Sequence, residues 1–170
     1  MDARRAQLMA DMIAPSPSEW GPHLWKMLHW LAQHSGKQRS KILQADELAA
    51  WTKILTLLQV VLPCAACRTH YTEYFKEHFD LNLLTSEERG ENIRKWLWEL
   101  HEDVNRRREV NGGVSYEDLQ VTYESLKFSE EREAFYRILE RAQRQNIVLR
   151  DNVLSFKKWI ATLYSICPRA

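Results

Sequence analysis

Apolar positions recur at the spacing of amphipathic helices along most of the chain. The first regular segment runs from Ser18 to about His34, and Ser18 can cap its first turn. Its apolar positions are Trp20, Leu24, Met27, Leu28 and Leu31. A second helix is predicted between a cap at Asp46 and Pro63, and its apolar face is wide enough for a core helix. That face consists of Leu48, Trp51, Ile54, Leu55, Leu58 and Val61 or Leu62.

Two more helices complete a predicted bundle. Proline is tolerated in the first turn of a helix, so we expect a third helix from Pro63 to about Phe79. Cys64 and Cys67 then lie at its start, with both sulfurs facing the same way. The segment Thr85-Ser86-Glu87-Glu88 has capping-box spacing and predicts a fourth helix that ends at Asn111-Gly112-Gly113. Four helices with short connections favour an antiparallel bundle.

Three further amphipathic segments follow Gly113, at 115–126, 129–146 and 151–166. The glycine-rich stop is the internal boundary that the sequence offers. We therefore expect a helical core over 1–113, and a fifth helix with a C-terminal helical extension over 114–170. The large apolar residues of the extension must be buried against another surface. They are Phe135, Ile138, Leu139, Phe156, Trp159, Ile160, Leu163 and Tyr164.

The composition supports an all-α class and narrows the range of partners. The 170 residues suit one domain with an appendage, and 5 Gly and 5 Pro against 7 Trp favour long helices over many short strands. Lys plus Arg total 24 against 23 Asp plus Glu, so the net charge of +1 provides no field that would attract nucleic acid. No apolar run approaches the roughly 20 residues of a membrane span, and the first residues lack a secretory signal. We expect a soluble protein.

The cysteines indicate a local site. Three are too few for a disulfide scaffold, but Cys64-Ala-Ala-Cys67 has the spacing of redox pairs and of half a zinc site. The partial positive charge of a helix start stabilises the thiolate that attacks a disulfide. Two alternatives remain: a buried inert pair, and a zinc site with His70 as third ligand. Since no further motif supplies a fourth ligand, no metal is expected.

Three motifs occur in order along the chain, and together they resemble the Erv/ALR family of flavin-linked sulfhydryl oxidases over about 18–125. They are Trp20-Gly21-Pro22-x-x-Trp25-x-x-x-His29, Pro63-Cys64-x-x-Cys67-x-x-His70-Tyr71 and Trp98-x-Leu100-His101-x-x-Val104-Asn105. The resemblance implies a four-helix bundle with a short fifth helix holding FAD, and a homodimer. It also implies a thiol oxidase that forms protein disulfides and reduces oxygen to hydrogen peroxide. The alternative is a zinc-stabilised or cofactor-free helical interaction module.

The resemblance also implies roles for individual residues. Cys67 would be the sulfur nearest the flavin, where it forms the charge-transfer contact, and Cys64 would exchange with the substrate. The residues expected to bind FAD are Gly21, Trp25, His29, His70, His101, Val104, Asn105, Arg108 and Tyr123. No Gly-x-Gly-x-x-Gly loop exists for a Rossmann-type site.

Several of these residues have alternative roles. Trp25 and Tyr123 could pack in the core, and Tyr116 competes with Tyr123 for a place against the adenine. His70 could flank the flavin or cap local structure. Which residue of Arg106-Arg107-Arg108 meets the phosphates is also open.

The chain departs from many members of that family in its cysteines. It has no second Cys-x-x-Cys shuttle and no cysteine pair to staple the fifth helix, because only Cys167 remains. Substrates could reach Cys64 directly, Cys167 could pair with another chain, or Cys167 could be a thiol on a frayed tail. Compact forms of this kind resemble those of large cytoplasmic DNA viruses. The expected location is therefore the host cytoplasm or virion, with the mitochondrial intermembrane space as alternative, and the expected partners are protein thiols of thioredoxin-like or virion proteins.

Overall fold

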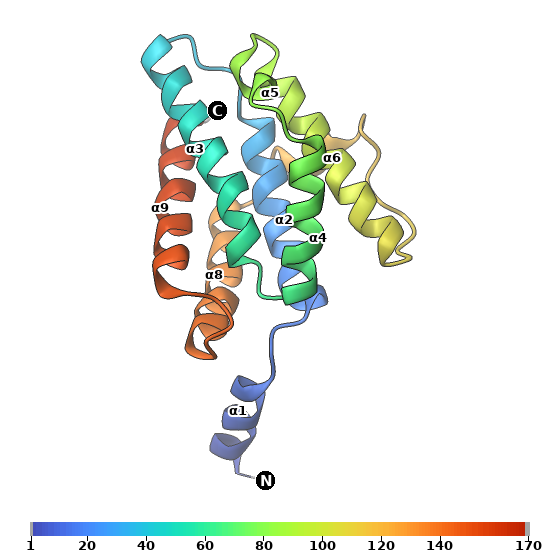
Figure 1. Cartoon of the computed structure of the whole chain (residues 1–170), viewed down its shortest axis with the longest axis vertical. Coiled ribbons are helices and arrows are strands. Elements are labelled where there is room, and N and C mark those ends of the chain that lie inside the picture. The colour runs from blue at the N-terminus through green and yellow to red at the C-terminus, as the bar shows by residue number, and fades with distance from the viewer. Residues whose placement is uncertain (1, 169–170) are drawn as a thin grey trace.

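The computed structural model describes residues 2–168, and this part of the chain is helical without a strand (Figure 1). The all-α class is thereby confirmed. The helices are α1 (Ala3–Met12), α2 (Pro17–Gln33), α3 (Lys41–Val61), α4 (Ala65–His78), α5 (Asn82–Thr85), α6 (Arg89–Arg107), α7 (Leu119–Tyr123), α8 (Phe128–Arg144) and α9 (Arg150–Ile166). None of them is long and apolar enough to cross a membrane.

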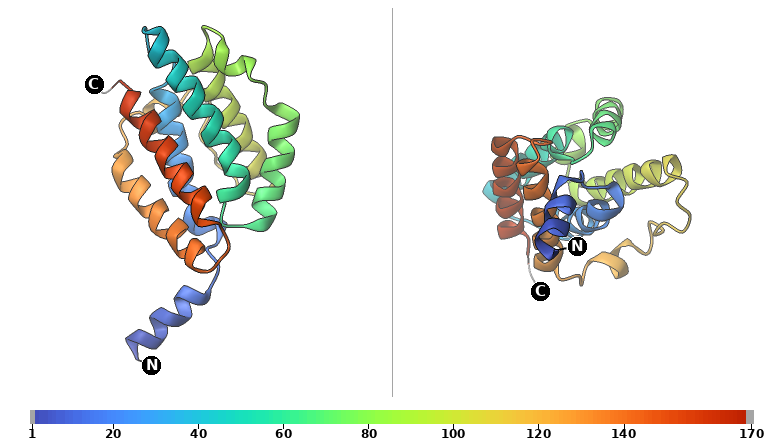
Figure 2. Two further views of the ribbon diagram at one scale, coloured as in Figure 1. Left: turned by 60° about the vertical axis from the view of Figure 1, so that its left-hand side comes forward. Right: turned by 90° about the horizontal axis from the view of Figure 1, so that it is seen from below.

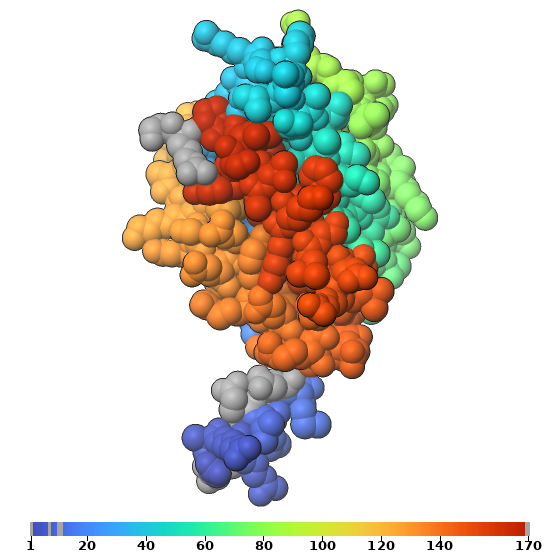
Figure 3. All heavy atoms as spheres, turned by 90° about the vertical axis from the view of Figure 1, so that its left-hand side faces the viewer, coloured from blue at the N-terminus to red at the C-terminus, as the bar shows by residue number. Residues whose placement is uncertain are grey.

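The predicted bundle helices correspond to α2, α3, α4 and α6, and the C-terminal helices pack onto them. Helix α8 lies along α2, and α9 lies along α3, so the extension covers one side of the bundle (Figure 2). Figure 3 shows α9 at the surface between α3 and α8. The extension therefore shares one hydrophobic core with the bundle, as its apolar pattern required. Its fully buried members are Phe135, Leu139, Phe156, Ile160 and Leu163. The division of the chain at residue 113 stays a prediction.

Several predicted helix starts are wrong by a few residues. Helix α2 begins at Pro17, a favoured first position, so Ser16 and not Ser18 precedes it. Helix α3 begins at Lys41, before the predicted cap at Asp46, because the intervening residues are good helix formers. The short helices α1 and α5 were not predicted, and Figure 1 shows α1 projecting from one end of the bundle.

The predicted capping box at Thr85 does not form. Helix α6 starts after Glu88 without a side-chain cap. Asp80 Oδ1 accepts the backbone N–H of Asn82 and starts α5, and the Thr85 hydroxyl donates back to the Asn82 carbonyl. Thr85 is therefore the last residue of α5, and α6 begins only at Arg89, too far along the chain for Thr85 to be its N-cap.

The predicted fifth helix over 115–126 is shortened to α7, because the residues before it are held in other conformations. Ser115 Oγ donates to Asp118 Oδ2 over 2.8 Å, which competes with a helical turn. The indole Nε1 of Trp98 donates to the Val114 carbonyl over 2.8 Å. The Trp98 bond holds the segment after Gly113 against α6.

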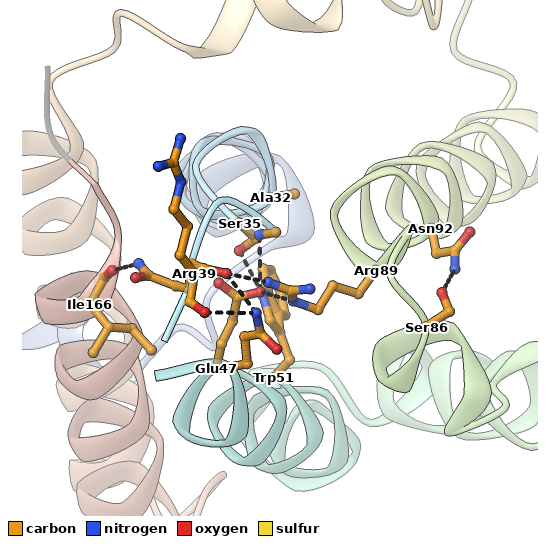
Figure 4. Close-up of polar contacts among 12 residues, drawn as sticks. Ala32, Ser35, Arg39, Glu47, Trp51, Ser86, Arg89, Asn92 and Ile166 are labelled. Atoms are coloured by element: carbon orange, nitrogen blue, oxygen red, sulfur yellow. Dashed lines mark hydrogen bonds and ion pairs between the residues drawn. The ribbon is translucent and has the colours of Figure 1, made fainter. Parts of the chain in front are cut away.

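A buried ion pair braces the end of the bundle where α3 and α6 begin (Figure 4). The Glu47 side chain is only 2% exposed, and its Oε1 accepts from Arg89 Nε over 3.2 Å and from the Gly36 N–H over 2.9 Å. A Cβ on Gly36 would lie 2.6 Å from the Gly90 Cα, and Gly36 has a φ of +80°. The two glycines therefore allow the backbones to touch. This brace leaves the opposite end of the bundle, where α4 begins, for the site.

Candidate functional site

The cysteine pair forms a disulfide at the start of α4. Cys64 is the N-cap residue, Cys67 lies in the first turn, and their Cα atoms are 5.1 Å apart. The Cys67 N–H donates to Cys64 Sγ over 3.2 Å. Pro63 precedes the helix instead of lying in its first turn, which corrects the predicted start. Since the two sulfurs are bonded to each other, they are not available as zinc ligands, and no cluster of three metal-binding side chains occurs among residues 2–168.

The disulfide lies in the wall of a cavity of about 370 Å³ enclosed mainly by α2, α3, α4 and α6. This volume is in the range of small-molecule sites. Most of the lining is apolar, and a few polar side chains lie at its edge. The lining residues are Pro17, Trp20, Gly21, Leu24, Trp25, Leu28, Leu58, Leu62, Cys64, Ala66, Cys67, His70, Tyr71, Leu100, Val104, Arg107 and Arg108.

Gly21 leaves part of this cavity open. It is buried in α2 and lines the cavity, yet a Cβ built on it would meet no atom within 4 Å. A larger side chain would therefore project into empty space. The backbone at Gly21 thus gives a flat ligand close access to the floor of the cavity.

An aromatic stack adjoins the cavity through Trp25. The Trp25 ring lies 4.0 Å from the ring of His101, at an interplanar angle of 8°. His29 contacts His101 through a hydrogen bond of 3.0 Å between Nε2 and Nδ1, and its ring stacks on Tyr123 at 4.5 Å. Helices α2, α6 and α7 therefore contribute flat side chains to one cluster.

Both histidines of the stack are held neutral. Burial, assisted by the neighbouring His101, lowers the pKa of His29 to about 3. Burial also lowers the pKa of His101 to about 4. His29 Nδ1 is buried without a hydrogen-bond partner in the described structure. An unpaired buried nitrogen is costly, so this atom is suited to a polar group of a bound ligand.

Most of the predicted site residues lie in the cavity wall or in the adjoining stack, and one lies in neither. Seven of them, the cysteines included, line the cavity: Gly21, Trp25, Cys64, Cys67, His70, Val104 and Arg108. His29, His101 and Tyr123 lie in the adjoining stack, whereas Tyr116 bonds to Glu91 and packs on Trp98. Asn105 is not in the cavity wall.

The environment of Asn105 explains its position. Its carbonyl accepts the Val110 N–H over 2.9 Å, and its Nδ2 would lie 3.1 Å from a Cβ on Gly113. The chain therefore folds back over Asn105 after α6 ends.

The three consecutive arginines at the end of α6 differ in position. Arg107 and Arg108 line the cavity, and Arg108 also donates to Ser18 Oγ over 3.0 Å. The Arg106 side chain is 76% exposed. The geometry therefore favours the last two arginines for contact with a ligand in the cavity.

Sequence reasoning missed Asp103. Its Oδ2 lies 2.7 Å from His70 Nε2 at the edge of the cavity. The i, i+4 spacing of Asp103 and Arg107 predicts an ion pair on α6. Nothing in the sequence indicates the contact with His70, which comes from another helix.

The expectation that Cys167 lies on a frayed tail is wrong. Cys167 is 4% exposed, and its N–H donates to the Leu163 carbonyl over 3.1 Å. Helix α9 packs on α3 up to this end, which keeps the last turn ordered. Figure 1 shows the C-terminal end of α9 at the opposite end of the bundle from the start of α4.

The fold and site define a helical-bundle protein with a Cys-x-x-Cys disulfide in the wall of an apolar cavity. The chain belongs to the Erv1/Alr family, whose model matches residues 22–124, more than half of its length. A protein of Frog virus 3 (isolate Goorha), provisionally named a FAD-linked sulfhydryl oxidase, is 32% identical over 91 residues. The match covers 54% of this chain and 57% of that protein, so the chain spans little more than half of this relative. No solved structure matches the chain.

Proposed function

We propose that the protein is an FAD-dependent sulfhydryl oxidase that converts pairs of protein thiols into disulfides and reduces oxygen to hydrogen peroxide. The observation that carries this proposal is the disulfide in the wall of an apolar cavity that also contains Gly21 and Trp25. Membership of the Erv1/Alr family and the name of the viral relative support it. When bound, FAD would accept two electrons and deliver them to oxygen.

The cavity and the adjoining stack fit such a cofactor. The apolar walls and the open backbone at Gly21 suit a flat ring beside the disulfide. The unpaired His29 Nδ1 offers a buried hydrogen-bonding position. Arg107 and Arg108 provide positive charge at the edge, where phosphates would be neutralised. Tyr123 and His101 would then contribute flat surfaces, and Val104 would contribute an apolar one.

The thiol chemistry begins at the cysteine pair. A substrate thiolate attacks Cys64 Sγ, the Cys64–Cys67 bond breaks, and the electron pair remains on Cys67. A second substrate thiolate then attacks the substrate sulfur of this mixed disulfide and releases Cys64 as a thiolate. The substrate has lost two electrons and both cysteines are reduced. The N–H of Cys67 that reaches Cys64 Sγ, together with the helix start, stabilises negative charge on Cys64.

We further propose protein thiols of thioredoxin-like or virion proteins as substrates. We also propose a host cytoplasmic or virion location, with the mitochondrial intermembrane space as alternative, and the match to a viral protein supports the viral context. The sequence has no second Cys-x-x-Cys, so we expect substrates to reach Cys64 directly. A homodimer stays a prediction, and the mass of the purified protein by light scattering would test it.

Absorbance and oxygen uptake test the proposed function. The purified full chain should show the visible absorbance of oxidised flavin, release FAD on denaturation, and consume oxygen with dithiothreitol. Cys64→Ser and Cys67→Ser should each abolish oxygen uptake, and Cys167→Ser is the matched control that should retain it. A colourless protein that takes up no oxygen after incubation with FAD would refute the proposal.

A further inference from the structure

We infer that His70 accepts the proton of the incoming substrate thiol and that Asp103 is the residue that positions His70 for this step. The inference rests on the proposed function and adds a proton path to it. It assigns His70 a role other than contact with the cofactor. The juxtaposition that carries it is a carboxylate–imidazole pair at the edge of the cavity that contains the disulfide.

The pair lies beside the cysteines by helix geometry. Cys67 and His70 are three residues apart on α4, so their side chains are neighbours on one face. Both line the cavity, together with Cys64. The imidazole and the disulfide are therefore exposed to the same incoming thiol.

The carboxylate reaches His70 from a different helix. Asp103 on α6 holds His70 Nε2 at 2.7 Å through its Oδ2. The two side chains are only 17% and 21% exposed, so water competes little for this bond. A neutral imidazole next to the carboxylate carries its hydrogen on Nε2, which leaves Nδ1 as the nitrogen that can accept a proton.

Asp103 is held in place and ionised by two arginines. Its Oδ2 also accepts from Arg107 Nε over 3.2 Å, and its Oδ1 accepts from Arg106 over 3.3 Å. Partial burial alone would raise the pKa of Asp103. The hydrogen bond from His70 and the charges of Arg107 and Arg106 outweigh it and lower the pKa, and the charge of His70 adds to them once the imidazole is protonated.

Other titratable groups lie near the His70–Asp103 pair. Tyr74 on α4 lies close to Glu99, Asp103 and Arg106 of α6. The pKa of Tyr74 is raised to about 12, first by burial and then by the charges of Glu99 and Asp103. Helix α3 contributes Leu58 to the cavity, its C-cap residue Leu62 also lines it, and neither side chain is charged. Asp103 is thus the carboxylate bonded to His70 in this group, and it can stabilise an imidazolium.

The proposed step moves one proton to His70 and one electron pair to Cys67. A substrate thiol transfers its proton to His70 Nδ1, and its sulfur forms a bond to Cys64 Sγ. The Cys64–Cys67 bond breaks, and its electron pair stays on Cys67 Sγ. The imidazolium, paired with Asp103, then lies one turn from the new thiolate and can neutralise or protonate it.

The test measures the first half of the reaction and needs no turnover. With oxygen excluded, dithiothreitol is mixed with the full chain between about pH 5 and about pH 9. Electron uptake is measured by counting the alkylated cysteines, with the bleaching of any bound flavin added. The variants are His70→Gln, Asp103→Asn, Asp103→Glu and the double variant. Glu102→Gln is the matched control, because it removes a neighbouring carboxylate of the same helix.

We expect His70→Gln and Asp103→Asn to slow the reduction at neutral pH by about tenfold or more. Glu102→Gln should stay within about twofold of the original rate, and Asp103→Glu should recover part of it. The difference in rate between these variants and the original protein should become smaller as the pH approaches the pKa of a thiol, about 8.5, since the reagent then supplies its own thiolate. The double variant should be no slower than His70→Gln, because Asp103 acts through His70.

Three outcomes would overturn the inference. They are a deficit of the same size at every pH, additive losses in the double variant, and an unchanged rate in Asp103→Asn with helicity intact. If Asp103→Asn loses helicity, the pH profile of the reduction rate in His70→Gln tests the inference instead. The two failures can be told apart. If the proposed function is wrong, the original protein binds no flavin. The rates of disulfide reduction still report on His70 and Asp103 in that case.

Discussion

His29 Nε2 and His101 Nδ1 lie 3.0 Å apart, so two imidazoles from α2 and α6 share a single hydrogen bond. Only one of these nitrogens can donate, and protonation of both rings would place two positive charges in contact. Burial is the main cause that lowers the pKa of His29 to about 3 and of His101 to about 4. The contact therefore links the aromatic stack of His29 and His101 to the pH dependence of stability.

We predict that the protein loses stability as the pH falls below about 6.5. Both folded-state pKa values lie below the unfolded value, so the unfolded chain binds more protons across this window and stability decreases on acidification. The loss should be on the order of 1 to 2 kcal/mol per histidine at about pH 5. Urea unfolding at several pH values measures it.

Two histidine variants test the cause of this pH dependence, one buried and one exposed. His29→Gln should flatten the dependence, whereas His78→Gln should leave it unchanged, because the His78 side chain is 51% exposed. If the stability of the original protein is flat between about pH 5 and pH 7, the neutral buried pair is not the cause we describe.

The opening at Gly21 predicts a size-dependent loss of cofactor. Gly21→Ala and Gly21→Leu share the same backbone cost, because a side chain before Pro22 disfavours helical conformation at that position. They differ in how far they project into the cavity. We therefore expect Gly21→Leu to bind several-fold less FAD per chain than Gly21→Ala, at similar helicity. Equal FAD content in both purified variants would place the ring elsewhere.

Long helices and motif residues were predictable from the sequence, because both depend on local spacing. The apolar period gave α2, α3, α4, α6, α8 and α9 to within a few residues, except that α3 starts five residues before its predicted cap. Gly21 and Trp25 were placed by their motif, and both line the cavity.

Contacts between distant segments were not predictable in the same way. Glu47 has the pattern of a surface residue, yet it is buried because Arg89 reaches it from α6. Asp103 was missed because its imidazole partner is 33 residues away. Cys167 was misjudged because its position near the end of the chain suggests fraying, whereas the packing of α9 on α3 buries it. The helix predicted over 115–126 is shortened to α7, because the pattern does not reveal the hydrogen bond from Trp98 to the Val114 carbonyl.

The two cysteines of the disulfide should give different spectra when replaced singly. In Cys64→Ser the remaining Cys67 thiolate would lie against the flavin and give a long-wavelength absorbance band. Cys67→Ser should lack that band, because in the proposed mechanism Cys64 is the outer sulfur that exchanges with substrate. Visible spectra of both variants near neutral pH provide the test. The band in Cys67→Ser alone would reverse the assignment of the two sulfurs.

Replacement of Cys167 should affect stability but not thiol oxidation. The residue is buried at the end of α9 that lies away from the start of α4, so it cannot relay electrons to Cys64 within the chain. A serine hydroxyl in its apolar surroundings costs about 1 to 3 kcal/mol, whereas Cys167→Ala avoids burying a hydroxyl. We expect Cys167→Ser to unfold at lower temperature than Cys167→Ala, while both consume oxygen with dithiothreitol at nearly the original rate. A many-fold loss of oxygen uptake in both variants, with FAD still bound, would mean that Cys167 reaches the disulfide of a neighbouring chain.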